Sequence, residues 1–348
     1  MNLQLRTRGT AVVSSSLFAL WTAASVSLLG APVAAQAEPG CSVEEAGARR
    51  ALTQAGRAVV SVAVADLFVR PDKSGPLADQ ALFGELLTVL PQSESCLDSS
   101  GRLVLVETAS TYRGYVPIQS LWPLTAPAPT ARPGTPAPPG MPGQATTRLR
   151  VTARLANLYR SPSVSLGNPL LSLPLHSEVL QVESFSSHWL KVALPDGSLG
   201  FLQRGDVEPV PAPQLPTPTC ILREARKYDG TPYLWGGRST LGIDCSGLVA
   251  NAFQACGVVS PRDARLQAAW SDVVPVSKQA ELQPGDLLFF QSESLTLPAK
   301  ITHVGLYLGH DRFLHASTSE RPSVHESTLS DPEWQRRYLT ARRYRTFL

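Results

Sequence analysis

The chain has 348 residues, 43% of them hydrophobic and 17% charged, which suits two or three globular domains. Its formal net charge is +3, and Arg6 and Arg8 are the only charged residues among the first 37; removing these two positive charges lowers the net charge to +1. A chain this close to neutrality gives no electrostatic case for binding nucleic acid.

The first residues have the pattern of a secretory signal. Arg6 and Arg8 form a basic start, residues 11–29 are apolar and uncharged, and residues 35–37 (Ala-Gln-Ala) form a small-x-small cleavage site. We therefore expect a signal peptide over residues 1–37 and an exported protein, periplasmic, extracellular or associated with the cell wall. A retained membrane anchor stays open because the apolar stretch is long enough to span a bilayer. No other segment has that length, and no lipid partner is expected.

Two proline-rich stretches divide the rest of the chain. Residues 124–147 cannot pack a core and are expected to form a stiff linker, and residues 209–218 repeat the pattern on a smaller scale. This division leaves three modules, at residues 40–123, 148–208 and 219–348.

Three short motifs recur in the same order in the first two modules. They pair residues 66–71 with 157–162, 84–89 with 177–182, and 114–116 with 200–202. Short alternating strands separated by turn residues at this spacing predict a small all-β barrel in each module. A ligand-binding role and a role as a spacer are equally open for these barrels, since fold does not decide function.

The third module changes its hydrophobic period. Residues 220–228 read as a short helix, and apolar positions between Leu248 and Cys256 lie on one face of a second helix that ends at Gly257. Three β-prone stretches then follow at 286–290, 302–308 and 312–317. A helical part followed by antiparallel strands predicts an α+β domain.

Cys245 is the candidate nucleophile. Asp244 is a natural N-cap, which would place Cys245 at the first helical position, where the helix dipole favours a negative charge. A thiol attacks as its thiolate, so we expect this position and a neighbouring imidazole to lower the pKa of Cys245. Gly242 and Gly247 leave room for a substrate beside the sulfur.

His303 and His315 are the candidate partners of that thiol. If the two strands form a hairpin centred on Gly309, the two histidines are directly opposed and point to the same face, which Gly305 keeps open. One ring can then accept the thiol proton while the other holds its tautomer. The other four histidines lack such a context. A zinc site on Cys245 and both histidines is the rival, but no second close pair of ligands is present, so we expect neither metal nor cofactor.

The chain has five cysteines, an odd number for an exported protein. Four of them allow three connectivities. We expect the bridges Cys41–Cys96 and Cys220–Cys256, chosen by proximity within a module, with Cys245 left as a free thiol.

Residues 219–348 resemble the NlpC/P60 family of bacterial cell-wall cysteine peptidases. The resemblance is carried by residues 230–237, 244–249, 282–287, 303–305 and 313–316. It implies a papain-like α+β fold with Cys245 as nucleophile, His303 as base and His315 as the group that orients it. It also implies that Tyr233 helps to hold the oxyanion; aromatic packing is the alternative role for this side chain.

The first two modules resemble bacterial SH3-like domains, and the three-module order resembles a subset of the same family. Members of that subset cut γ-D-glutamyl–diamino acid bonds in muropeptides that begin with a free L-alanine. The resemblance implies that Asp244 and Ser246 bind the substrate amine and that Glu85 and Tyr112 of the first barrel contribute to the pocket. Ala264 stands where the subset has a hydroxyl residue.

The sequence therefore predicts a multidomain protein, with two small all-β SH3-like barrels followed by a papain-like α+β catalytic domain. The expected activity is hydrolysis of peptidoglycan-derived peptides through a Cys-His-His triad and a thioester. An endopeptidase acting on intact peptidoglycan and an inactive wall-binding protein are the alternatives. The oligomeric state is open.

Overall fold

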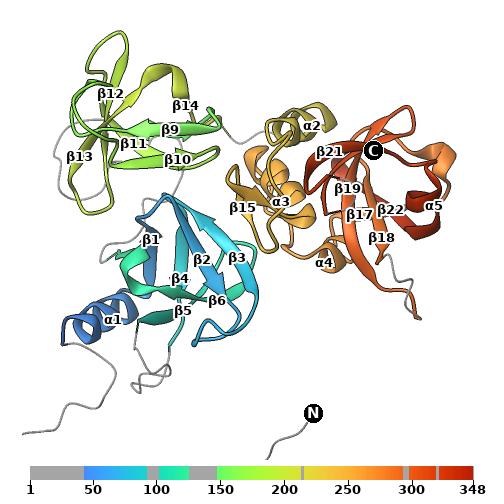
Figure 1. Cartoon of the computed structure of the whole chain (residues 1–348), viewed down its shortest axis with the longest axis horizontal. Coiled ribbons are helices and arrows are strands. Elements are labelled where there is room, and N and C mark those ends of the chain that lie inside the picture. The colour runs from blue at the N-terminus through green and yellow to red at the C-terminus, as the bar shows by residue number, and fades with distance from the viewer. Residues whose placement is uncertain are drawn as a thin grey trace, which may run out of the picture. The chain divides into compact units, whose positions relative to one another are not determined.

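A computed structural model describes residues 43–91, 102–124, 147–212, 215–292, 298–318 and 321–347 (Figure 1). They all belong to one compact unit, Pro39–Leu348. The expected signal peptide, nearly all of the linker at 124–147 and the expected Cys41–Cys96 bridge lie outside the described residues.

The first β-rich body is a seven-stranded sheet with one helix beside it. The strand order is β3-β2-β6-β5-β4-β1-β7, and every pair is antiparallel. Its elements are α1 (Val43–Ala55), β1 (Arg57–Val60), β2 (Val64–Phe68), β3 (Leu77–Leu82), β4 (Leu86–Val89), β5 (Leu103–Glu107), β6 (Arg113–Pro117), the 3-10 turn Ile118–Ser120 and β7 (Leu121–Pro123). The helix α1, which the sequence did not predict, buries Leu52 against the hydrophobic core of this body.

The second body has a five-stranded sheet, ordered β13-β12-β11-β8-β14, and a separate pair, β10-β9. Its strands are β8 (Thr147–Val151), β9 (Leu155–Leu158), β10 (Leu171–Pro174), β11 (Glu178–Glu183), β12 (Trp189–Ala193), β13 (Leu199–Gln203) and β14 (Val207–Pro209), with a 3-10 turn at Arg204–Asp206. Alternating buried positions on these strands form its own hydrophobic core.

The internal sequence repeat corresponds to the same glycine–leucine packing contact in both bodies. A Cβ on Gly114 would lie 2.8 Å from Leu67, and a Cβ on Gly200 would lie 2.8 Å from Leu158. Leu67 and Leu158 occupy matching positions in the two repeats, and both are fully buried. Only glycine lets the paired strands come this close, which explains why both modules have one there.

The third body has a six-stranded antiparallel sheet, ordered β17-β22-β18-β19-β20-β21, with helices on both faces (Figure 1). Its elements are α2 (Pro218–Arg226), β15 (Arg238–Ser239), β16 (Gly242–Ile243), α3 (Cys245–Ala255), α4 (Ala264–Ala268), β17 (Val273–Val276), the 3-10 turn Gln279–Glu281, β18 (Leu287–Gln291), β19 (Ile301–Gly309), β20 (Arg312–Ser317), β21 (Ser323–Thr328), α5 (Pro332–Arg337), β22 (Tyr338–Tyr344) and the 3-10 turn Arg345–Phe347. The predicted α+β architecture of this module is present, with helix and strand bounds within a few residues of those expected.

The sheet of the third body is buried on both faces. On one face Phe289, Val304 and Leu314 pack with the apolar side of α3. On the other face Phe290 and Phe313 pack around Trp334 of α5. A sheet covered on both sides excludes water along its strands, so a histidine on β19 or β20 lies in a dry environment.

A disulfide joins Cys220 of α2 to Cys256, the C-cap of α3, with a Cα–Cα distance of 6.1 Å. The predicted Cys220–Cys256 bridge is therefore confirmed, and Cys245 is a free thiol, as expected. The bridge fixes α2 against the far end of the helix that carries the nucleophile.

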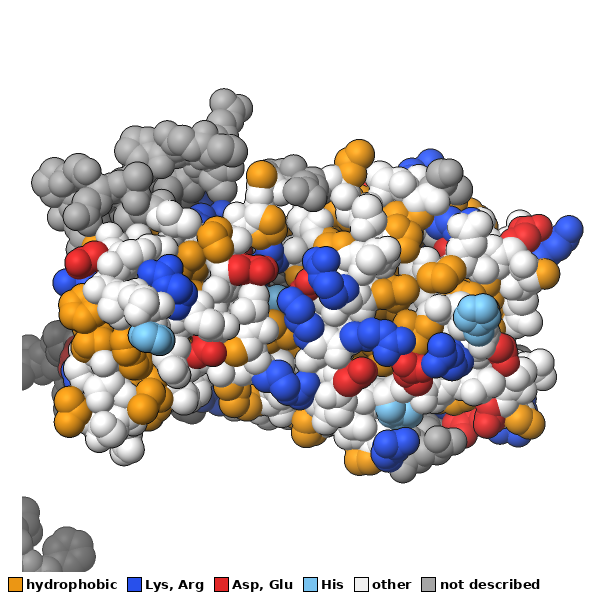
Figure 2. Space-filling view, turned by 90° about the horizontal axis from the view of Figure 1, so that it is seen from above, with side chains coloured by type: hydrophobic (Ala, Val, Ile, Leu, Met, Phe, Trp, Pro, Cys, Tyr) orange, Lys and Arg blue, Asp and Glu red, His pale blue; other side chains and the backbone are white. Residues whose placement is uncertain are grey.

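Within the described ranges no helix is long and apolar enough to span a membrane. On the face shown in Figure 2, basic and acidic side chains are interspersed. This mixture agrees with the small net charge of +3 and offers no uniformly basic surface on that face.

Candidate active site

The helix α3 begins at Cys245, and Asp244 is its N-cap. The Oδ1 atom of Asp244 accepts the backbone N–H of Gly247 at 2.6 Å, and Oδ2 accepts that of Gly236 at 2.8 Å. A short polar side chain just before an apolar helix satisfies N–H groups that have no partner within the helix. The placement of Asp244 as N-cap and of Cys245 at the first helical position agrees with the sequence prediction.

The resting state of Cys245 differs from the sequence expectation. Burial raises the pKa of its thiol to about 12, and the negative charge of Asp244 acts in the same direction. The backbone N–H groups of Val304 and Ser246 point to the sulfur and lower the pKa, but they do not offset burial. Cys245 is 7% exposed, so the dry surroundings dominate over the helix dipole, and the resting nucleophile is a neutral thiol.

His303 and His315 come together, although the predicted hairpin register is wrong. The strands pair Leu306 with Leu314 and Gly309 with Arg312, and a bulge lies between them. The turn residues His310 and Asp311 both have positive φ, at 50° and 63°, so the turn lies beyond Gly309 rather than on it. This register makes the two histidines diagonal neighbours rather than directly opposed.

Diagonal neighbours on one face of a sheet are still within reach of ring side chains. The Nε2 atom of His303 lies 2.8 Å from Nδ1 of His315, and both rings are buried. Because the N–H of Val304 reaches the Cys245 sulfur, the nucleophile lies beside the backbone that carries His303. The structure thus brings the two histidine rings into contact and places Cys245 beside the backbone of the residue that follows His303.

Both histidines are neutral at rest. Burial lowers the pKa of His303 to about 3, and the positive charge of Arg337 adds to the effect. Burial also lowers the pKa of His315 well below its ordinary value, helped by its neighbours His303 and His325. A neutral imidazole has a lone pair and can act as a general base toward a thiol within its reach.

Tyr233 lies beside the nucleophile. It pairs with Ile243 in an isolated β-bridge, one residue before the N-cap of α3. Burial raises the pKa of its hydroxyl, and the next causes are the charges of Cys245 and Asp244. A hydroxyl that stays protonated so close to Cys245 can donate a hydrogen bond to an oxygen of a bound substrate.

Asp244 takes part in a buried ion-pair network that the sequence did not reveal. Arg262 donates to both oxygens of Asp244 and, through Nε, to Oδ1 of Asp79 at 2.5 Å. Asp79 belongs to β3 of the first body and is 0% exposed. Its Oδ2 atom has no hydrogen-bond partner among the described side chains and backbone groups. Two carboxylates sharing one guanidinium leave one negative charge in excess next to Cys245.

Ser246 completes this network. Its hydroxyl donates to Asp244 Oδ1 at 3.2 Å and accepts from Arg262 Nη1 at 2.9 Å. The Nε2 atom of Gln267 donates to the Ser246 carbonyl at 3.0 Å. Ala264, where the resemblance led us to look for a hydroxyl, is buried on α4.

Glu85 and Tyr112 are the substrate contacts expected from the first β-rich body, and each has a different partner in the structure. Glu85 pairs with Arg238 at 3.1 Å, and burial raises its carboxyl pKa. Its carboxylate thus contacts a different arginine from the one that holds Asp244. The hydroxyl of Tyr112 lies 3.4 Å from Asp263, the residue after Arg262, and burial raises the pKa of this phenol to about 12.

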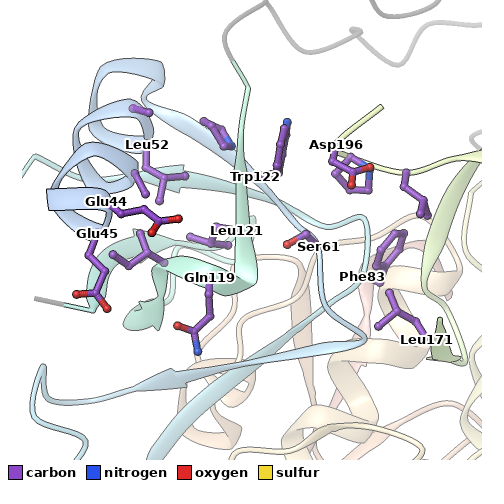
Figure 3. Close-up of a pocket in the computed structure, with 16 residues that line it drawn as sticks. Glu44, Glu45, Leu52, Ser61, Phe83, Gln119, Leu121, Trp122, Leu171 and Asp196 are labelled. Atoms are coloured by element: carbon purple, nitrogen blue, oxygen red, sulfur yellow. The ribbon is translucent and has the colours of Figure 1, made fainter. Parts of the chain in front are cut away.

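Two cavities lie away from the nucleophile. The larger, of about 730 Å³, is bordered by Glu44 and Trp122 of the first body and by Leu171 and Asp196 of the second (Figure 3). The smaller, of about 210 Å³, includes Glu85 in its lining. Neither is lined by the cysteine or the two histidines, so neither coincides with the candidate active site. Among the described residues, no group of three or more His, Cys, Asp or Glu side chains is arranged to hold a metal ion.

Comparison with known proteins gives concordant matches. Residues 230–343 match the NlpC/P60 family. Over 278 residues the chain is 29% identical to a dipeptidyl-peptidase 6 of Lysinibacillus sphaericus, covering 75% of this chain and 87% of that protein. Over 197 residues it is 31% identical to a gamma-D-glutamyl-L-lysine dipeptidyl-peptidase of Bacillus cereus, covering 56% of each chain. The chain thus spans just over half the length of this second relative.

A solved structure supports the fold of most of the chain. An NlpC/P60 family protein from Bacillus cereus superposes with a TM-score of 0.66 at 23% identity, over 83% of this chain and 99% of that one. At 23% identity, this structural similarity supports the fold alone.

Proposed function

We propose, from the match of residues 230–343 to the NlpC/P60 family, that the chain is a peptidase that hydrolyses γ-D-glutamyl–diamino acid bonds in peptidoglycan-derived peptides. The names of the first two relatives, a dipeptidyl-peptidase 6 and a gamma-D-glutamyl-L-lysine dipeptidyl-peptidase, support this substrate class. The preferred substrates are peptides that begin with a free L-alanine.

The proposed reaction is an acyl transfer to Cys245. His303 takes the thiol proton as the sulfur attacks the γ-glutamyl carbonyl, and it then gives that proton to the leaving amine. Water releases the acyl group from the thioester, again with His303 as base. The neutral resting state of Cys245 and His303 supports this order, because the thiolate forms only when a substrate is in place.

The oxyanion of the tetrahedral intermediate needs donors close to the sulfur. The backbone N–H of Cys245 lies in the first turn of α3, where N–H groups have no partner within the helix. The Tyr233 hydroxyl is the second donor in this proposal. Donors held in a dry site stabilise developing charge more than they would in water.

The network of Asp79, Arg262 and Asp244 is the observation that carries the proposed specificity. Its excess negative charge lies at the N-cap next to the nucleophile, where a free substrate ammonium would sit two residues from the scissile bond. The unpartnered Oδ2 atom of Asp79 offers an acceptor for that ammonium, and Ser246 offers a hydroxyl. An acetylated amine has no charge and would leave these acceptors unsatisfied.

Within the first body we assign the amine-binding carboxylate to Asp79 rather than to Glu85. Glu85 is engaged by Arg238 and Gln254, whereas Asp79 shares Arg262 with the N-cap. Tyr112 keeps its proposed role at the rim of the pocket, since it contacts the residue that follows Arg262.

The remaining parts of the proposal rest on the sequence pattern. We propose SH3-like barrels over residues 40–123 and 148–208, a catalytic domain over 219–348, and a signal peptide over 1–37 that exports the protein to the periplasm or the cell wall. The first barrel contributes Asp79, so it is part of the active site and not only a spacer.

The test uses purified residues 38–348 and two peptides, L-Ala-γ-D-Glu-diaminopimelate with a free and with an acetylated N-terminus. We expect mass spectrometry to show cleavage of the free peptide only. Equal cleavage of both peptides would instead indicate a general wall endopeptidase, and digestion of intact sacculi would support that reading. No cleavage of either would favour a wall-binding protein.

Cys245→Ala is the matched control for these reactions. It removes the sulfur without touching the Asp79–Arg262–Asp244 network, so it is expected to retain the fold and lose all cleavage. Retained cleavage would place the nucleophile elsewhere.

A further inference from the structure

Both ring nitrogens of His315 lie within hydrogen-bond distance of another side chain. Its Nδ1 atom lies 2.8 Å from Nε2 of His303, and its Nε2 atom lies 3.0 Å from the hydroxyl oxygen of Ser327. Ser327 is on β21, whose strand pairs with β20 so that His325 lies opposite His315 and Ser327 lies opposite Phe313. The three side chains therefore form one continuous hydrogen-bonded row, from His303 through His315 to Ser327.

A neutral imidazole carries a single ring hydrogen, so the direction of each hydrogen bond in this row depends on the next one. Burial keeps His303 and His315 neutral. If His315 donates from Nε2 to Ser327, its Nδ1 must accept, and His303 then donates from Nε2. If Ser327 donates to His315 instead, every bond in the row reverses.

Only the first direction gives a working base. With its hydrogen on Nε2, His303 has a lone pair on Nδ1, the remaining nitrogen, free to take the Cys245 proton. With the row reversed, Nδ1 of His303 carries the hydrogen, and the lone pair of the ring lies on Nε2, where it accepts from His315. The ring then has no free lone pair to accept the thiol proton. An incorrect histidine tautomer in a catalytic triad can cost several orders of magnitude in rate.

We propose that Ser327 is a positioning residue that sets the tautomer of His315, and through it that of His303, by accepting the hydrogen of His315 Nε2. The inference rests on the proposed role of His303 as the base. Ser327 touches neither substrate nor sulfur, and it acts only through the two rings.

Aromatic and basic side chains surround the row. His325 packs against His315 with 4.7 Å between ring centroids, and its own Nδ1 donates to the Ser323 carbonyl at 3.0 Å. Arg337 lies on the Trp334 ring, which stacks on His303, and its positive charge disfavours protonation of both rings.

The direct test is ¹⁵N NMR of the imidazole rings in the full mature chain, without substrate. Ring nitrogens with and without a hydrogen have well-separated shifts, so the spectrum reports each tautomer. We expect His315 and His303 to carry their hydrogens on Nε2 in the wild type. In Ser327→Ala we expect His315 to become a mixture of tautomers. A wild-type hydrogen on Nδ1 of His315, or an unchanged tautomer in Ser327→Ala, would overturn the proposal.

Steady-state kinetics of Ser327 variants give a second, independent test of the proposal. Ser327→Ala is expected to lower kcat about tenfold, the loss of one hydrogen bond, with KM changed less than twofold. Ser327→Thr keeps the hydroxyl and is expected to retain most of the activity. Thr328→Ala, a change at the exposed neighbouring position, is the control. An equal fall in kcat in Ser327→Thr, or a fall in KM with kcat unchanged, would contradict the proposed effect on the tautomer.

The NMR and kinetic experiments distinguish a failure of this proposal from a failure of the proposed function. The NMR measurement needs no substrate, so it stands even if the γ-glutamyl peptides are not cleaved. If Ser327→Ala does not fold, as judged by circular dichroism, the wild-type spectrum and Ser327→Thr still decide the direction of the row.

Discussion

Arg262 holds the carboxylate of Asp244 in a bidentate pair, donating from Nη1 at 2.9 Å and from Nη2 at 2.8 Å. The same guanidinium reaches Asp79 of the first β-rich body, and all three side chains are buried. One residue therefore links the N-cap of α3 to a separate β-rich body. The candidate active site and the contact with the first body are parts of the same electrostatic network.

Replacing Arg262 with leucine is expected to destabilise the chain strongly. It leaves Asp79 and Asp244 buried without a counter-charge, which typically costs about 3–5 kcal/mol. Urea unfolding measures this loss of free energy. Arg265→Leu, an exposed change three residues along, is expected to stay within about 0.5 kcal/mol. A similar small effect in Arg262→Leu would mean that the network contributes little to stability.

Asp79→Asn and Glu85→Gln are expected to affect substrate choice differently. Both remove a first-barrel charge without changing the shape of the side chain. Because Asp79 shares Arg262 with the N-cap, its replacement should lower the preference in kcat/KM for a free over an acetylated amine by about tenfold or more, the size of one charge-assisted hydrogen bond. Glu85 contacts Arg238, so its replacement should leave that ratio within twofold. The reverse pattern would restore Glu85 as the amine-binding residue.

Local sequence signals were enough to predict the local structure around Cys245 and the two histidines. The N-cap position of Asp244 and the free thiol of Cys245 follow from a short polar residue before an apolar helix and from the pairing of Cys220 with Cys256. The strands around His303 follow from β-prone runs split by turns. These features depend on neighbours in the chain, which the sequence displays directly.

Other features depend on contacts between distant segments. The pairing of Asp79 with Arg262 joins residues 183 positions apart, and no local pattern marks either one. The hairpin register was mispredicted because the turn uses two residues of positive φ after Gly309, together with a bulge. The raised pKa of Cys245 follows from burial, which the sequence indicates only by hydrophobicity and not by depth.

The disulfide between Cys220 and Cys256 is expected to stabilise the catalytic helix. It closes a loop with a sequence separation of 36, for which loop-entropy arguments give about 3–4 kcal/mol. The double variant Cys220→Ala/Cys256→Ala, made in a Cys245→Ala background to prevent thiol exchange, should lower Tm by several degrees. Calorimetry of both proteins under oxidising conditions measures the difference. An unchanged Tm would show that packing between α2 and α3 alone is sufficient.

The buried neutral histidines predict a loss of stability in mild acid. Their folded pKa values lie below the ordinary value of 6.5, so the unfolded chain binds more protons between pH 6.5 and pH 5. Stability is therefore full above about pH 6.5 and falls as the pH decreases, by about 1.5–2 kcal/mol per histidine across this window.

Urea unfolding at several pH values checks the sign and the size of this effect. The double variant His303→Gln/His315→Gln should flatten the dependence. It should not abolish it, because burial also lowers the pKa of His176. His188→Gln, a change at an exposed histidine, should retain the wild-type slope. If the double variant kept the full slope, protonation of the catalytic pair would not be what destabilises the fold in acid.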